Sequence, residues 1–95
     1  MNDSRAAKVK AIFARKKNVN GTDRAYALKV AGYTQRQIAT GLGVTPETVH
    51  QVLHDRITSR RVANYVSDAI GLPTDTVWPS GRYRRAQLRV KNPKG

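Results

Sequence analysis

Residues 45–54 hold most of the side chains in this chain whose types and spacing suggest chemistry. Glu47, His50 and His54 are three and four residues apart, so they would share one face of a helix. Two histidines at that spacing can bind zinc. No fourth ligand is evident, however, and the His-Glu-x-x-His pattern of zinc proteases is absent. We therefore expect neither a bound metal nor a cofactor.

Catalytic patterns are also missing from the sequence. No serine lies in a nucleophile-elbow pattern, and no glycine-rich loop would cradle a phosphate. The absence of cysteine excludes disulfide bonds and thiolate zinc sites. We predict that the protein is not an enzyme and has no catalytic residues.

The same polar face has the side chains that hydrogen-bond to base edges in a DNA groove. Gln51 can form two hydrogen bonds with adenine, Glu47 can accept one from cytosine, and Pro46 can contact a thymine methyl group. The residues predicted to contact bases are Thr45, Pro46, Glu47, Thr48, His50, Gln51 and His54. Because threonine hydroxyls at a helix start also suit phosphates, Thr45 and Thr48 can serve either role.

Side chains on both sides of this segment could contact the phosphates of the same duplex. Gln35 and Arg36 would begin the preceding helix, and the arginines follow the polar segment. The predicted phosphate contacts are Gln35, Arg36, Arg56, Arg60, Arg61, Arg82, Arg84 and Arg85.

Two short helices joined at a glycine are expected to position these side chains. Thr34 with Gln37 predicts a capping box at the start of the first helix, which runs to residue 42. Gly43 tolerates the positive φ of the turn, and Thr45 before Pro46 favours a second helix over 46–54. The inward positions are small or apolar, namely Ile38, Ala39, Leu42, Val44, Val49, Val52 and Leu53. Residues 35–54 are thus typical of a helix-turn-helix.

The sequence pattern also predicts helices in the rest of the chain. We expect helices over 5–17, over 23–31 with Thr22 or Asp23 as N-cap, and from residue 58 or 59 to 70, and a short turn capped by Thr74. No strand is expected, so the predicted fold is all-α. Ile12 and Phe13 would either pack on the body or join two subunits. We expect Trp78 to cover the core.

The charge of +12 is concentrated at the two ends of the chain. Residues 1–20 have six basic residues and one acidic residue, residues 80–95 have six basic residues and no acidic one, and residues 21–79 have six basic and five acidic residues. We therefore divide the chain into a basic N-terminal segment (1–20) that can be helical, a helix-turn-helix domain (21–79) and a flexible basic tail (80–95). Tyr83 in the tail would either stack on DNA or be solvated.

Charge indicates the kind of partner, and hydropathy argues against a membrane-spanning or secreted protein. A basic excess of this size favours polyanions such as DNA, RNA or an anionic membrane surface. No apolar run reaches the length of about 18 residues that a membrane span needs, and the charged N-terminus does not resemble a signal peptide. We expect a cytoplasmic protein that does not bind membranes.

Residues 39–83 resemble the Ner family of DNA-binding regulators from Mu-like phages and prophages. The resemblance rests on residues 43–49, GVTPETV, and on residues 77–80, VWPS, followed by Arg82 and Tyr83. It implies a compact four- to five-helix domain of the lambda-repressor type that represses transcription at phage operators, with Pro46, Thr48 and Gln51 on the DNA face. Gly81 is an insertion relative to the family pattern, and residues 1–20 exceed the family's compact unit.

These patterns favour a sequence-specific repressor that acts in the bacterial cytoplasm by covering a promoter. One such domain offers few base contacts, so two copies on neighbouring half-sites, or a homodimer, are expected on double-stranded DNA. Two alternatives stay open. The first is an architectural or recombination accessory protein that bends DNA and binds mainly through its basic ends. The second is an antitoxin-type module that docks an acidic protein.

Overall fold

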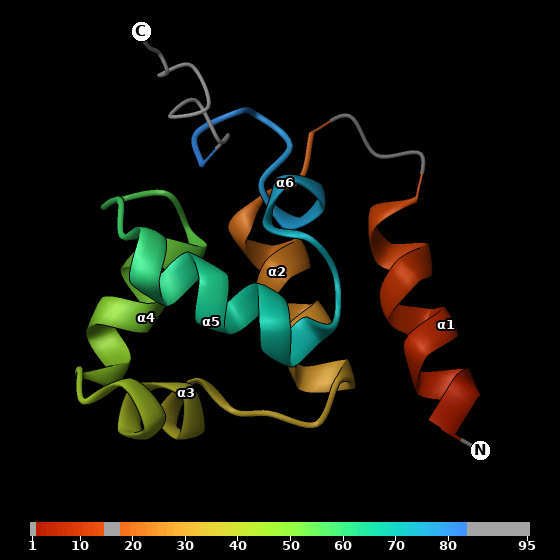
Figure 1. Cartoon of the computed structure of the whole chain (residues 1–95), viewed down its shortest axis with the longest axis horizontal. Coiled ribbons are helices and arrows are strands. Elements are labelled where there is room, and N and C mark those ends of the chain that lie inside the picture. Colours follow the sequence, from red (N-terminus) through yellow and green to blue (C-terminus); the bar gives the residue numbers. More distant parts are fainter. Residues whose placement is uncertain (1, 15–17, 84–95) are drawn as a thin grey trace, which may run out of the picture.

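The structure is a computed structural model that describes residues 2–14 and 18–83. These residues form six α-helices and no strand (Figure 1), which confirms the all-α prediction. The helices are α1 (Asn2–Phe13), α2 (Gly21–Val30), α3 (Gln35–Leu42), α4 (Pro46–Leu53), α5 (Arg60–Ile70) and α6 (Thr74–Val77). The predicted phosphate contacts Arg84 and Arg85 lie outside the described residues.

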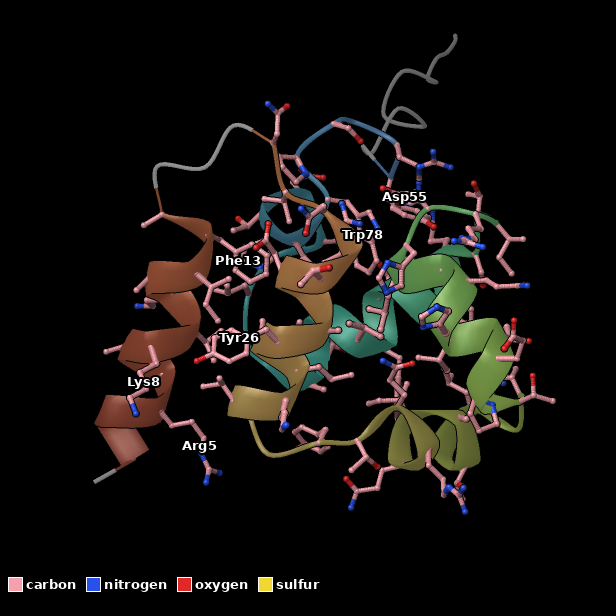
Figure 2. All side chains as sticks on the ribbon, turned by 180° about the vertical axis from the view of Figure 1, so that it is seen from behind. Arg5, Lys8, Phe13, Tyr26, Asp55 and Trp78 are labelled. Atoms are coloured by element: carbon pink, nitrogen blue, oxygen red, sulfur yellow. The ribbon has the colours of Figure 1, made fainter. Side chains whose placement is uncertain are left out.

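Helix α1 lies at one end of the longest axis of the molecule and α4 lies toward the other end (Figure 1). α1 packs against α2, and α2 also contacts α4 and α5. Val9 and Phe13 are buried, and Phe13 lies between α1 and α2 (Figure 2). Of the two roles left open for this helix, the structure shows packing on the body of its own chain. α1 begins at Asn2, three residues earlier than expected.

α3 and α4 begin at the residues that the sequence indicates. α3 ends at Leu42 as predicted, and α4 ends at Leu53, one residue before its predicted end. Thr34 Oγ1 accepts a hydrogen bond from the Gln37 backbone N at 3.0 Å, and Gln37 Oε1 accepts one from the Thr34 N at 2.9 Å. Gly43 ends α3 with φ = 74°, in the left-handed region that favours glycine. Thr45 then caps α4, and Pro46 takes its first position. Local side-chain chemistry therefore fixes both helices and the turn between them.

Two other predicted caps were wrong. The N-cap of α2 is Asn20, whose side chain accepts from the Asp23 N at 2.9 Å, so Asp23 is the third residue of a capping box and Thr22 is not a cap. Before α6 the N-cap position belongs to Pro73, and the Thr74 hydroxyl instead donates to Asn64 Oδ1 at 2.9 Å. In both places another residue supplies the extended backbone that a cap position requires.

The C-terminal segment differs from its prediction. Trp78 is fully buried, as expected of a residue that covers the core. Tyr83 is only 2% exposed, so it is neither a solvated tail residue nor available to stack on DNA. Its ring packs edge-on against Trp78 with centroids 5.2 Å apart, and its hydroxyl accepts from the Ser59 N, the N-cap residue of α5, at 3.1 Å. Residues 80–83 therefore pack as part of the folded body.

Replacement of Tyr83 by alanine should destabilise the fold by about 3 kcal/mol, because it removes a buried ring and leaves a cavity beside Trp78. Tyr83→Phe keeps the ring and loses only the bond to Ser59, so it should cost about 1 kcal/mol. Tyr26 is 57% exposed, which makes Tyr26→Ala the matched control at roughly 0.5 kcal/mol or less. Urea unfolding measures all three. A Tyr83→Ala protein as stable as Tyr26→Ala would contradict the packing described above.

Candidate nucleic-acid interface

Helix α4 turns its apolar side into the core and its polar side to the solvent. Val49, Val52 and Leu53 are fully buried. The seven residues predicted to contact bases all keep some exposure: Thr45, Pro46 and Glu47 are exposed, and Thr48, His50, Gln51 and His54 are half-buried. The structure therefore places the predicted residues together along the first turns and the outer side of α4.

Several of these side chains already bond to one another. Thr45 Oγ1 accepts from the Thr48 N at 3.1 Å and lies 3.0 Å from Thr48 Oγ1, so this hydroxyl is engaged in capping. Gln51 Nε2 donates to Glu47 Oε2 at 3.2 Å across one turn of the helix. The polar face is thus partly ordered before any ligand binds, and its members are not independent hydrogen-bonding groups.

The rings of His50 and His54 lie against each other with their planes tilted by 41°. Their ring centroids are 4.3 Å apart, and His54 also lies against Gly21, where a Cβ atom would collide with the imidazole. The pKa of His54 is lowered from its usual value, mainly by burial and further by His50, Arg56 and Arg24. Asp55 opposes this shift, and the balance favours the uncharged imidazole. In the described part of the chain, no group of three or more histidines and carboxylates is arranged to hold a metal ion.

The residues predicted to bind phosphates divide into two groups. Arg36, at the start of α3, and Arg56, after α4, are exposed, and neither side chain bonds to another described residue. Gln35 is half-buried at the start of α3. Arg36 and Arg56 are therefore the arginines of residues 35–61 whose guanidinium groups are most available to a phosphate.

The other described arginines that were predicted to contact phosphates bond to groups within the protein. Arg61 Nη2 donates to the Leu42 carbonyl at 2.7 Å, at the end of α3. Arg60 Nη1 donates to the Tyr83 carbonyl at 3.1 Å. Arg82 Nη1 donates to Thr58 Oγ1 at 2.7 Å. The sequence prediction did not foresee these intramolecular bonds, which reduce the freedom of all three side chains to move to a phosphate.

Arg24 holds α4 from inside the protein, and sequence reasoning missed it. Arg24 is 1% exposed and donates to three backbone carbonyls: Leu53 at 2.7 Å, Val77 at 2.8 Å and Val19 at 3.1 Å. Its guanidinium also lies 4.9 Å from the centre of the Trp78 ring. Burial lowers the pKa of Arg24, and the nearby Asp55 carboxylate opposes that shift. Arginine stays protonated in proteins, so Arg24 remains a cation.

Asp55 lies just beyond α4 and completes this cluster, with its side chain 33% exposed. Its carboxylate accepts from Arg24 Nη1 and from Trp78 Nε1, both at 3.1 Å, and lies 3.5 Å from Arg82 Nε. Asp55 and Trp78 lie close together near the start of α2 and the end of α4 (Figure 2). Asp55 has φ = 61°, an unusual conformation for a residue other than glycine, and this network holds it there. The cluster of Arg24, Asp55, Trp78 and Arg82 therefore fixes where α4 ends.

A sequence signal for Arg24 does exist. Arg24 is three residues before Ala27 and four before Leu28, both buried, so it falls on the inward stripe of α2. A buried arginine needs an anion and several acceptors, and a buried tryptophan N–H needs one acceptor. Those two requirements point to an acidic partner, but the sequence offers five acidic residues between 21 and 79 and does not select Asp55.

Comparisons of the chain with protein-family models, with curated proteins and with solved structures found no match. None of the helices in residues 2–14 and 18–83 has both the length and the apolar character that crossing a membrane requires. What the protein does is therefore inferred from its sequence motifs and from the geometry of its residues.

Replacement of Arg24 by methionine should destabilise the protein by about 3–5 kcal/mol, because it leaves the Asp55 carboxylate and three carbonyls without their main donor. Arg36→Met, on the exposed start of α3, is the matched control and should change stability by roughly 0.5 kcal/mol or less. The free energy of unfolding in urea measures both variants. Equal, small losses would mean that the contacts of Arg24 do not hold the fold.

Proposed function

We propose that the protein is a sequence-specific regulator that binds double-stranded DNA with α4 in the major groove. The observation that carries this proposal is the unit formed by α3, the left-handed turn at Gly43 and α4, which gathers the seven predicted base-contact residues, each at least partly exposed, at one end of the body. A groove-reading helix needs such an outward face on a rigidly held helix. Arg24 and Arg61, which bond to the ends of α4 and α3, supply the rigidity.

Phosphate contacts are proposed on both sides of this helix. Arg36 precedes α4 and Arg56 follows it, and both are exposed. By contrast, Arg5 and Lys8 lie on α1, on the far side of α2 from α4 (Figure 2). Of the two basic ends of the sequence, the C-terminal one is therefore the better candidate for contact with the DNA that α4 reads, since Tyr83 lies against the start of α5.

The proposed action is repression by occlusion in a bacterial cytoplasm, with no catalytic step and no cofactor. The resemblance of residues 39–83 to Ner regulators and to the lambda-repressor type of domain supports this part of the proposal. One α4 contacts only a few base pairs, and each good two-bond contact discriminates by about 1–3 kcal/mol. Useful specificity therefore calls for two copies, or a homodimer, on half-sites about one helical turn apart.

Gln51→Ala should weaken binding to a selected DNA site by about 1–3 kcal/mol and leave binding to random DNA unchanged, because a base contact contributes only at the matched sequence. The site is obtained by repeated selection from random duplexes, and affinities are measured by fluorescence anisotropy at fixed salt. Arg36→Ala is the contrasting variant. Loss of a phosphate contact should weaken binding to the selected site and to random DNA alike. Equal losses on both duplexes for Gln51→Ala would count against reading by α4.

Removal of residues 84–95 should flatten the salt dependence of DNA binding without lowering the melting temperature. Each lost phosphate contact reduces the slope of log affinity against log salt by about 0.9. Lys8→Ala on α1 is the control and should leave the slope unchanged. If the truncated protein loses its site preference together with its affinity, an architectural protein that binds through its basic end explains the molecule better than a specific repressor does.

A further inference from the structure

We propose that Glu47 is a positioning residue that fixes how the Gln51 amide meets an adenine, and that it is not an independent reader of cytosine. This inference rests on the proposed function, because it concerns the face of α4 that would enter the groove. The observation behind it is the hydrogen bond from Gln51 Nε2 to Glu47 Oε2, 3.2 Å long. The two residues are four apart on α4, the spacing that brings side chains together on a helix.

The chemistry of the two groups sets the direction of the amide. A carboxylate has no proton to donate, so Glu47 can bond only to the NH₂ end of Gln51. Nε2 is therefore held toward Glu47, nearer the start of α4, and Oε1 points away from that carboxylate. Without the carboxylate, the amide could rotate by half a turn and exchange its donor and its acceptor. The bond to Glu47 thus fixes which side of the Gln51 amide donates and which side accepts.

This orientation of the Gln51 amide matches the major-groove edge of adenine and does not match that of guanine. After the bond to Glu47, Gln51 still has one free N–H beside the Oε1 acceptor. Adenine needs one donor for its N7 and one acceptor for its N6 amino group, and this is the pair that remains. Guanine presents two acceptors, N7 and O6, so its O6 would face Oε1 without a proton between them. The arrangement favours adenine over guanine through both attraction and repulsion.

The bond also lowers the cost of binding. Gln51 is half-buried on the helix, and Glu47 restrains its side chain before DNA arrives. A long side chain that is already ordered loses less conformational freedom when it meets a base. With one carboxylate oxygen occupied by Gln51, Glu47 is less able to approach a separate cytosine. We therefore assign the readout to Gln51 and the orientation to Glu47.

The experiment begins with the selected site of the wild-type protein and locates the base pair at which Gln51→Ala loses its preference. Affinities for duplexes with A·T or G·C at that position are then measured for the wild type, Glu47→Ala, Glu47→Gln, Gln51→Ala and the double variant Glu47→Ala/Gln51→Ala. Asp68→Ala removes another exposed acidic residue, from α5, and controls for the gain in net charge. Thermal unfolding of each variant checks that the fold is kept.

We expect Glu47→Ala to reduce the preference for A·T over G·C at the Gln51 position by at least about fivefold. The double variant should show no greater loss than Gln51→Ala, since Glu47 acts through Gln51. Glu47→Gln should keep part of the preference, because its carbonyl still accepts from Gln51. Asp68→Ala should change affinity for all duplexes alike.

Two results would overturn the inference, and they differ. If Glu47→Ala leaves the preference at the Gln51 position intact and alters a neighbouring base pair, Glu47 reads a base by itself and the proposed function still holds. If the wild type selects no sequence at all and Gln51→Ala changes nothing, the proposed function fails together with this inference.

Discussion

The position of α4 depends on one buried arginine. Arg24 ties the end of α4, the end of α6 and the segment before α2 to a single guanidinium, and Asp55 provides the opposite charge. A charged group is expensive to bury, and it persists only where several acceptors and an anion surround it. Because these acceptors come from segments far apart in the sequence, satisfying Arg24 requires the segments to take a single arrangement. The small apolar core then fills the space that this arrangement leaves.

The basic residues of this protein serve two purposes, which the net charge alone does not separate. Arg24, Arg61 and Arg82 bond to the protein itself, and two of them bond to carbonyls at helix ends. Arg36 and Arg56 keep their guanidinium groups exposed to solvent. A helix C-terminus is the negative end of its dipole, so the arginines at the ends of α3 and α4 also neutralise charge next to the proposed DNA face.

Local sequence signals predicted the helices and the turn well, because those features depend on neighbouring residues. The capping box of Thr34, the left-handed Gly43 and the Thr45-Pro46 start of α4 are each set within a few positions. Long-range contacts were not predictable in the same way. Tyr83 lies in a run of arginines and reads as a tail residue, although it packs on Trp78 and bonds to the Ser59 N.

The outward face of α4 could also be predicted from helical spacing, since the buried valines define its opposite side. The contacts within that face could not. The bond between Gln51 and Glu47 depends on side-chain conformations, and the engagement of Arg60 by the Tyr83 carbonyl depends on where the chain returns. Residue types therefore indicate which groups are available, whereas tertiary structure decides which of them are already occupied.

The close approach of Gly21 to His54 joins the start of α2 to the end of α4. Any side chain at position 21 would occupy the space of the His54 imidazole, which belongs to the residue that ends α4. The ring would have to rotate or the helix would have to shift. A substitution at this buried position, 33 residues before His54 in the sequence, would therefore change the surface that α4 presents without replacing any exposed residue.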